Sequence, residues 1–279
     1  MIKSLSITQK IYYVLRVTAA MCFIGHGAFG LITKAIWTNY FAVFGIGHDL
    51  AYRLMPVLGT VDIIMGLILL FYPIRIIAGW LVVWALITAS LRPLSGEPFG
   101  EFIERAGNYG APFALLLLCG TGQGLQSWFQ KLKAPLALQE DQLKKIQLSL
   151  RISAFLLFAG HGWLNLIGKK GLLGQYESLG FHNVHQVSLT AGIIELIAAL
   201  LLLIRPSKPV LIIFIIWKTG TELFYPHYEI VEWVERGGSY GVLLALWYTL
   251  IPPYNRYSLP HKDTISGGTL EFEMSDKPI

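Results

Sequence analysis

The sequence predicts an all-α integral membrane protein in which eight transmembrane helices form two parallel four-helix repeats. The first observation behind this prediction is the composition: of 279 residues, 54% are hydrophobic and only 14% are charged. A typical soluble domain carries about 25% charged residues, so this chain has too little polar surface to fold in water. The other two observations are a series of long apolar segments and an internal duplication.

Eight apolar segments approach the roughly 20 residues that a helix needs to cross about 30 Å of hydrocarbon. Each must be helical, because lipid cannot satisfy exposed backbone groups. The first segment is interpreted as a retained helix and not a signal peptide, because Arg16 interrupts it and a close copy recurs in mid-chain. The predicted spans are residues 12–32, 51–71, 74–92, 109–127, 148–167, 186–204, 208–225 and 238–252.

The connections between the spans carry an orientation signal. When alternate connections are assigned to alternate sides, fourteen Lys and Arg residues fall on the side of the N-terminus and seven on the other. The positive-inside rule then places both termini in the cytoplasm, with the chain in the cell (inner) membrane. Residues 128–147 mix lysines with Trp, Phe and Leu, which predicts an amphipathic cytoplasmic linker. Residues 253–279 are expected to form a polar cytoplasmic tail.

A duplication organises the whole chain. Residues 15–34 align with residues 150–169, with identical residues at half of these 20 positions. The alignment continues at an offset of 133 in the second and third helices and of 131 in the motif ERxGxYG at 104–110 and 235–241. The repeats are therefore 1–127 and 148–252. Since four is an even number, both insert in the same direction, and they are expected to pack side by side about a pseudo-two-fold axis along the membrane normal.

Two short motifs carry a resemblance to a known family. Each repeat has a G-H-G element at the end of its first helix and opens its second helix with Gly-x-x-Asp or Gly-x-x-Glu, a combination that resembles the DoxX-like family of four-helix membrane proteins. The resemblance implies membrane redox chemistry, as in a thiosulfate:quinone oxidoreductase subunit, with a quinone as bound molecule and other membrane redox subunits as partners. Many family members have no assigned activity, so whether this chain is an enzyme stays open. The matching residues are Gly25, His26, Gly27, Gly59 and Asp62, and Gly160, His161, Gly162, Gly192 and Glu195.

The same repeats hold ionisable residues within the predicted spans. A charged group at mid-bilayer costs about 2.5–3.5 kcal/mol, so Asp62 and Glu195 are expected to face the bundle interior and to mark a ligand site or pathway. The alternative is a protonated carboxyl bonded to a neighbouring helix. His26 and His161 can shuttle protons or bind a ligand. The alternative to such a role is a structural histidine whose hydrogen bonds are satisfied within the bundle, beside glycines that allow close helix packing, namely Gly25, Gly27, Gly160 and Gly162.

Two further charge patterns distinguish the halves. Lys218 and Glu222 lie four residues apart on one helical face, so they can neutralise each other in the membrane. The first half lacks both charges, which suggests that one repeat keeps a polar pocket and the other is mainly scaffold, with a structural ion pair as the alternative. Arg105 and Arg236 of the ERxGxYG motif are interpreted as structural residues that hold a preceding carboxylate near a helix start.

Several classes of function are disfavoured. Cys22 and Cys119 lie within apolar runs, without the spacing of a metal site or disulfide scaffold, so no metal is predicted. The net charge of +5 comes without a nucleic-acid-binding motif, so no nucleic-acid partner is expected. Dinucleotide-binding loops, P-loops and Ser/His/Asp triads are missing. His26 and His161 could meet on the pseudo-two-fold axis as haem ligands, but one such pair makes haem a poor candidate.

The leading hypothesis is a redox-linked protein that binds a quinone or another lipophilic small molecule in an intramembrane pocket of the outer half. The candidate ligand-binding or proton-handling residues are His26, His161, Asp62, Glu195, Lys218 and Glu222. The competing hypothesis is a non-enzymatic one: a small-solute transporter, a lipid- or cargo-binding protein, or an assembly subunit of a membrane complex. Transport would favour paired broken helices, whereas Gly and Pro here cluster at helix ends.

Overall fold

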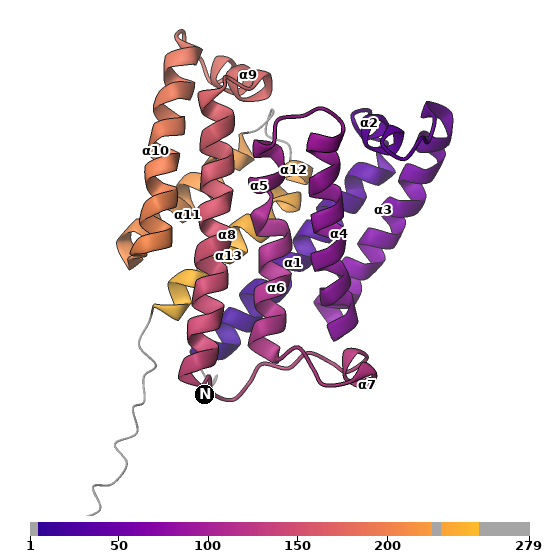
Figure 1. Ribbon diagram of the computed structural model, residues 1–279, viewed down its shortest axis with the longest axis vertical. Coiled ribbons are helices and arrows are strands. Elements are labelled where there is room, and N and C mark those ends of the chain that lie inside the picture. Colours follow the sequence, from indigo (N-terminus) through magenta and orange to yellow (C-terminus); the bar gives the residue numbers. More distant parts are fainter. Residues whose placement is uncertain (1–4, 225–229, 251–279) are drawn as a thin grey trace, which may run out of the picture.

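The computed structural model describes residues 5–224 and 230–250; the elements among them are helices joined by loops, with no strand beyond one isolated bridge between Ile74 and Lys131 (Figure 1). The predicted tail 253–279 lies outside the described residues, as do the last positions of the seventh and eighth predicted spans. The helices are α1 (Ile7–Leu31), α2 (Trp37–Ala42), α3 (His48–Phe71), α4 (Arg75–Leu94), α5 (Gly100–Ile103), α6 (Ala106–Cys119), α7 (Leu125–Trp128), α8 (Glu140–Leu166), α9 (Lys170–Ser178), α10 (Val184–Ile204), α11 (Lys208–Leu223), α12 (Ile230–Glu235) and α13 (Gly237–Thr249).

Four of these helices are long and apolar enough to cross a membrane: α1, α3, α4 and α10. A fifth span is formed if α8 and α9, which meet at a bend of 81°, count together. The prediction of eight spans is therefore not supported by helix length. The helices α6, α11 and α13 have 14, 16 and 13 residues, which at about 1.5 Å per residue gives only about 20–24 Å. The helical path breaks at Arg105 and Arg236, just before α6 and α13.

The ends of the first helices differ from the predicted bounds for local reasons. α1 begins five residues before the predicted position 12, because Ser6 forms a capping box. Its hydroxyl accepts a hydrogen bond from the Gln9 backbone N–H at 3.2 Å, and its own N–H donates to the Gln9 side chain at 2.9 Å. α8 begins at Glu140, inside the predicted linker, so the described connection between the halves is shorter than 128–147.

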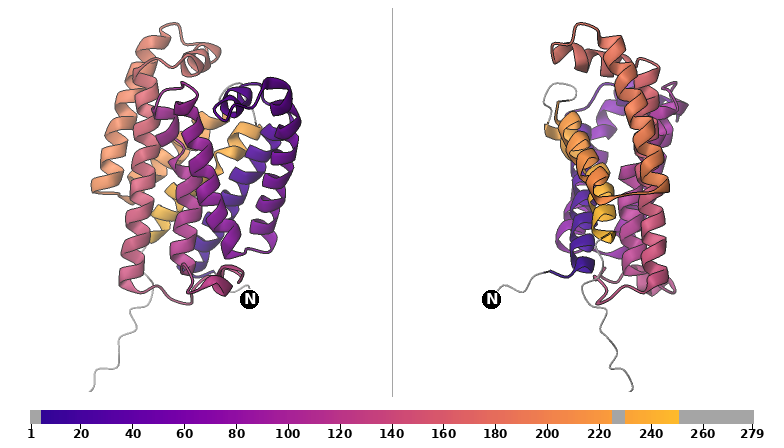
Figure 2. Two further views of the ribbon diagram at one scale, coloured as in Figure 1. Left: turned by 45° about the vertical axis from the view of Figure 1, so that its right-hand side comes forward. Right: turned by 90° about the vertical axis from the view of Figure 1, so that its left-hand side faces the viewer.

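The arrangement of the helices repeats between the halves. α1 packs along α3, and α8 packs along α10, with α1 and α8 both starting at the end of the bundle that carries α7 (Figures 1 and 2). α2, beside α3, and α9, beside α10, both lie at the opposite end. Equivalent arginines support the match: Arg16 Nε donates to Leu69 O at 3.1 Å, and Arg151 Nε donates to Leu203 O at 2.7 Å. Each satisfies carbonyl groups at the end of the following long helix.

The two halves interlock. Besides α3, α1 packs against α12 and α13 of the second half, while α8 packs against α5 and α6 of the first. α6 and α13 in turn lie against each other. The prediction of two separate units packed side by side is therefore incomplete. The last helices of each half pack against the first helix of the other half. This exchange brings side chains of both halves to each candidate site.

Candidate ligand-binding site

The first half places a histidine against an acid in its interior. His26 comes from α1 and Asp62 from α3, and the distance between His26 Nδ1 and Asp62 Oδ2 is 2.7 Å. Trp84 of α4 donates its indole N–H to the same carboxylate oxygen at 3.3 Å. A carboxylate only accepts, so the bond assigns a proton to Nδ1 of the imidazole. Within the described residues His26 Nε2 takes part in no hydrogen bond, and this nitrogen is available to a ligand.

The second half repeats this arrangement. His161 Nδ1 lies 2.7 Å from Glu195 Oε2 and 2.9 Å from Oε1, and Trp217 donates its indole N–H to Glu195 Oε1 at 3.1 Å. Asn165 adds a further donor to this carboxylate, with Nδ2 3.1 Å from Oε2. The position equivalent to Asn165 in the first half is Gly30. The two halves thus share a His–acid–Trp unit, and the second one is more fully hydrogen-bonded.

The glycines of the G-H-G elements explain how these units are assembled. An alanine Cβ at Gly25 would lie 2.5 Å from Glu235 Cα, and one at Gly160 would lie 2.7 Å from Glu104 Cα. The first glycine of each element therefore lets α1 or α8 touch the backbone of the opposite half. The second glycine admits the neighbouring long helix: a Cβ at Gly162 would lie 2.9 Å from the backbone carbonyl of Gly192. The histidine between the two glycines is fixed from both sides.

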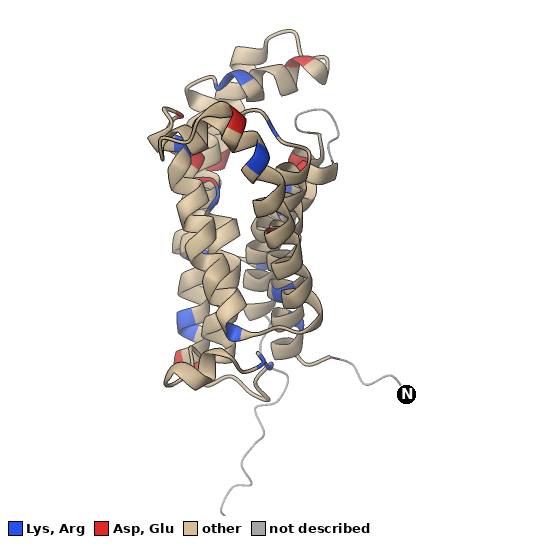
Figure 3. Cartoon of the chain, turned by 90° about the vertical axis from the view of Figure 1, so that its right-hand side faces the viewer, with Lys and Arg blue, Asp and Glu red and all other residues tan. Residues whose placement is uncertain are grey.

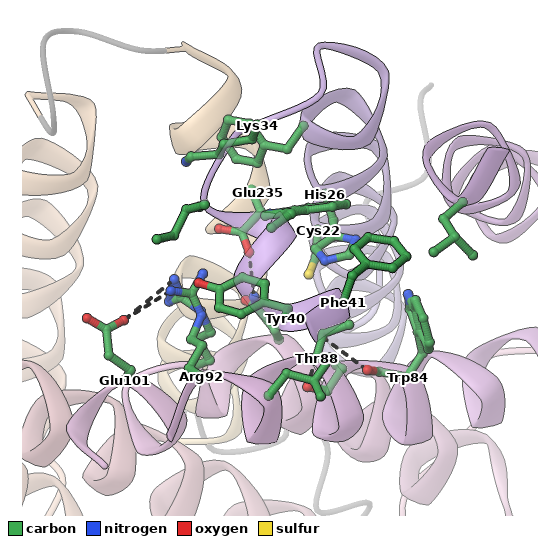
Figure 4. Close-up of a pocket in the computed structure, with 18 of the residues that line it drawn as sticks. Cys22, His26, Lys34, Tyr40, Phe41, Trp84, Thr88, Arg92, Glu101 and Glu235 are labelled. Atoms are coloured by element: carbon green, nitrogen blue, oxygen red, sulfur yellow. Dashed lines mark hydrogen bonds and ion pairs between the residues drawn. The ribbon is translucent and has the colours of Figure 1, made fainter. Parts of the chain in front are cut away.

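A cavity of about 610 Å³ adjoins the first unit (Figure 4). His26 lines it together with aromatic residues of α2 and α4, and the His26 ring lies against that of Trp37 with centroids 4.6 Å apart. The side chains of Tyr40, Phe41 and Trp84 also line the cavity. Figure 4 shows His26, Phe41 and Trp84 toward one side of this space and Arg92 with Glu101 toward the other. The wall combines aromatic and aliphatic side chains with a cluster of charged residues, so the cavity has an apolar part and a polar part, and a concave space of this kind is typical of a small-molecule site.

The cavity reaches the outer surface of the bundle. Phe44 and Val57 both line it, and they are 63% and 58% exposed, respectively. Val57 lies on α3, one of the helices able to cross a membrane. In a membrane, such a surface faces lipid, so the opening favours a lipophilic ligand.

Charged side chains lie around the cavity as pairs. Lys34 of the first half bonds Glu232 of the second at 2.9 Å, and Arg92 lies 3.2 Å from both Glu97 and Glu101. The hydroxyl of Tyr40 donates to Glu97 at 2.5 Å. The other cations of the lining are paired as well: Arg105 with Glu104, Lys169 with Glu101 and Arg236 with Glu235. The charges therefore largely neutralise one another, so the polar end of the cavity suits a neutral ligand with hydrogen-bonding groups better than an ion.

The ERxGxYG motifs meet between the halves, which goes beyond the structural role predicted for Arg105 and Arg236. Glu104 Oε1 accepts from Arg105 at 2.7 Å and from Arg236 at 3.1 Å. Arg236 also lies 3.2 Å from Glu235 and 3.4 Å from Glu232. Figure 3 shows acidic and basic residues interspersed near the end of the bundle that carries α9. This buried network joins the two repeats.

The remaining candidate residues lie apart from the large cavity. Lys218 and Glu222 form an ion pair on α11, and both are buried.

The sequence did not single out Trp84 and Trp217. Each follows the acid of its repeat by the same 22 residues, and this repeated tryptophan is a signal that could have identified them. Trp37 and Tyr40 had no such signal. Among the described residues, no group of three His, Cys, Asp or Glu side chains is placed to hold a metal ion.

Compared with known proteins, the chain matches no family model, no curated protein and no solved structure. The structure alone therefore defines the class: an all-helical protein with helices able to cross a membrane and an aromatic cavity beside a His–Asp pair. The DoxX-like resemblance stays a prediction, resting on the two short motifs described above.

The buried network predicts a pH dependence of stability. Glu104 lies between α5 and α6, outside the four helices able to span a membrane. Burial acts to raise the pKa of its carboxyl, but Arg236, Lys169 and Arg105 together hold that pKa well below its ordinary value. A depressed pKa contributes stability above the ordinary glutamate pKa of about 4.3, and this contribution is lost as the pH falls toward the pKa of the folded state.

The expected result is a lower melting temperature for Glu104→Gln than for the wild type, with a constant gap from pH 7 to pH 5 that narrows as the pH is lowered from 5 to 3. Thermal unfolding of the detergent-solubilised protein measures it. A gap that keeps its size between pH 5 and pH 3 would contradict the role given to the Glu104 carboxylate.

Proposed function

We propose that the protein is a redox-linked membrane protein of DoxX-like type that binds a quinone, or another lipophilic small molecule with a polar ring, in the cavity beside His26. One observation carries the proposal: the imidazole of His26, held by Asp62, lies on the wall of a cavity that opens between the exposed apolar side chains of Phe44 and Val57. The ring fits among Trp37, Tyr40 and Trp84, and the lipophilic tail leaves toward Phe44 and Val57.

The hydrogen-bonding chemistry of His26 suits such a ligand. With the proton on Nδ1 directed to Asp62, Nε2 accepts a hydrogen bond from a quinol hydroxyl, and as an imidazolium it donates to a quinone carbonyl. Reduction of a quinone to a quinol takes up two electrons and two protons. In this proposal the electrons come from a partner membrane redox subunit, and His26 exchanges protons with the bound ring.

The proposal includes a placement in the membrane. The eight predicted spans, arranged as two parallel four-helix repeats, lie in the cell membrane with both termini in the cytoplasm. The shorter helices α6 and α13 lie against each other, flanked by α1 and α8, where they need not match the full hydrocarbon thickness. The support is the repeat of the packing between the halves and the excess of Lys and Arg on the side of the N-terminus.

The test is a titration of the purified protein with a short-chain quinone, followed by quenching of tryptophan fluorescence, since Trp37 and Trp84 line the cavity. His26→Ala is expected to weaken binding by about 10- to 100-fold, the effect of losing one hydrogen bond of roughly 1.5–3 kcal/mol to a charged or polarised group. His48→Ala is the matched control, because this histidine is exposed and does not line the cavity.

Equal quinone affinity in His26→Ala and the wild type would contradict the proposal, as would a wild-type protein that binds no quinone. In the second case, accumulation of a labelled solute in proteoliposomes would support the competing class of transporters.

A further inference from the structure

The second half holds a space of only about 10 Å³ where the first half has about 610 Å³. Seven of the eight residues around this small space occupy positions equivalent to residues around the large cavity. The seven are His161, Lys169, Leu172, Gln175, Thr221, Glu104 and Arg236, which match His26, Lys34, Trp37, Tyr40, Thr88, Glu235 and Arg105 in that order. Both halves therefore build one site, and only one of the two sites is open.

The eighth residue shows what closes the second site. It is Glu222, whose equivalent in the first half is Ala89, and its ion-pair partner Lys218 replaces Ala85. Ala85 lines the open cavity, so a methyl group there corresponds to a long charged side chain in the second half. Lys218 is 1% exposed and is among the largest fully buried side chains of the described residues. The pair brings two charged head groups into the interior at this site.

A second contact closes the site from α9. Gln175 replaces Tyr40, and its side-chain N–H donates to the backbone carbonyl of Thr221 on α11 at 2.9 Å. This bond joins α9 to α11 beside Glu222. In the first half the Tyr40 hydroxyl donates to Glu97, so there the equivalent bond is made to the side chain of a residue beyond the end of α4. The second site is thus filled by its own side chains, and the Gln175–Thr221 hydrogen bond holds α9 against α11.

We infer that the second half contains a closed copy of the ligand site, in which the Lys218–Glu222 ion pair occupies the place that the polar ring of a lipophilic ligand takes in the first half. The inference rests on the proposed function for the class of ligand. It makes Ala85 and Ala89 the residues that keep the first site open, and it sets the stoichiometry at one ligand per chain.

The test exchanges these residues between the halves. Lys218→Ala combined with Glu222→Ala is expected to raise the number of bound ligands from one to two per chain. The probe is a tail-less benzoquinone, measured by equilibrium dialysis, because only the volume of the ring has to be opened. Adding His161→Ala to this variant should return the number to one. Removing both members of the pair leaves neither of its charges buried alone, and Arg236 keeps Glu104, Glu232 and Glu235 as partners.

The reciprocal variant, Ala85→Lys combined with Ala89→Glu, should bind no ligand while keeping its fold, because it fills the first site with the same pair. A folded Lys218→Ala/Glu222→Ala protein that still binds one ligand would overturn the inference, and so would a wild type that binds two. If that variant does not fold, ligand binding by the reciprocal variant would overturn it equally. A wild type that binds none would instead refute the proposed function.

Discussion

Alanine at Gly25 is expected to destabilise the protein by at least about 3 kcal/mol, at or beyond the upper end of the usual range for overpacking. The added Cβ would lie 2.5 Å from Glu235 Cα and 2.8 Å from Glu235 Cβ. Backbone atoms of a packed helix cannot move aside as a flexible side chain can, so α1 and α12 would have to separate. Melting temperature and the yield of monodisperse protein in detergent measure the effect.

Gly220→Ala provides the matched control. Gly220 lies within α11, and an added Cβ there meets no atom within 4 Å. Because alanine favours the helix by about 1 kcal/mol over glycine, this variant should be as stable as the wild type or slightly more so. If Gly25→Ala is as stable as Gly220→Ala, the close contact of α1 with the second half is wrong. The interlocked arrangement of the two halves would then be wrong as well.

Replacement of Arg236 by methionine is expected to cost about 3–5 kcal/mol, the range for breaking a buried ion pair by removing one partner. Its guanidinium lies within 4 Å of Glu104, Glu222, Glu232 and Glu235. Methionine keeps much of the length but leaves these carboxylates in the interior without their shared cation. Thermal unfolding at pH 7 measures the loss.

Arg105→Met is the comparison, because Arg105 contacts only Glu101 and Glu104 among the described carboxylates. It should cost less than Arg236→Met. Arg236 lowers the pKa of the Glu104 and Glu235 carboxyls. The defect of Arg236→Met should therefore shrink as the pH falls below about 4.3, where these carboxyls take up protons. A larger effect at Arg105, or a defect that grows in acid, would contradict the network described here.

The duplication is what made much of this site predictable from the sequence. Because G-H-G and Gly-x-x-acid recur in both repeats, His26 with Asp62 and His161 with Glu195 could be selected before any distance was known. The structure brings each pair together at 2.7 Å. The i, i+4 spacing of Lys218 and Glu222 likewise indicated an ion pair, and the structure forms one.

Other features depend on packing that no periodicity encodes. The contact of Gly25 with Glu235 joins residues 210 positions apart, and motif spacing gives no sign that each first helix lies against the other half. The charged pair Lys218–Glu222 suggested a polar pocket, whereas the open cavity lies where small residues replace it. A small side chain leaves space, and an alanine such as Ala85, which lines the cavity, is too common in helices to indicate one.

Helix length was the least predictable property. The predicted spans 109–127 and 238–252 begin just after Arg105 and Arg236, where the helical path breaks, and α6 already ends at Cys119, before Gly120 with its positive φ of 81°. An apolar window averages over such breaks and does not locate them. Apolar windows therefore indicate eight segments, while among the described residues four helices are long and apolar enough to span, or five with the bent pair of α8 and α9.

Photoaffinity labelling with an azido-quinone most directly tests the claim that the cavity beside His26 is the ligand site. After illumination, proteolysis and mass spectrometry locate the modified residues. The account predicts adducts on cavity residues of α2 and α4, above all Trp37, Tyr40 and Trp84, that are lost when excess unlabelled quinone is present. Adducts confined to residues outside this cavity, or labelling that excess quinone does not reduce, would contradict it.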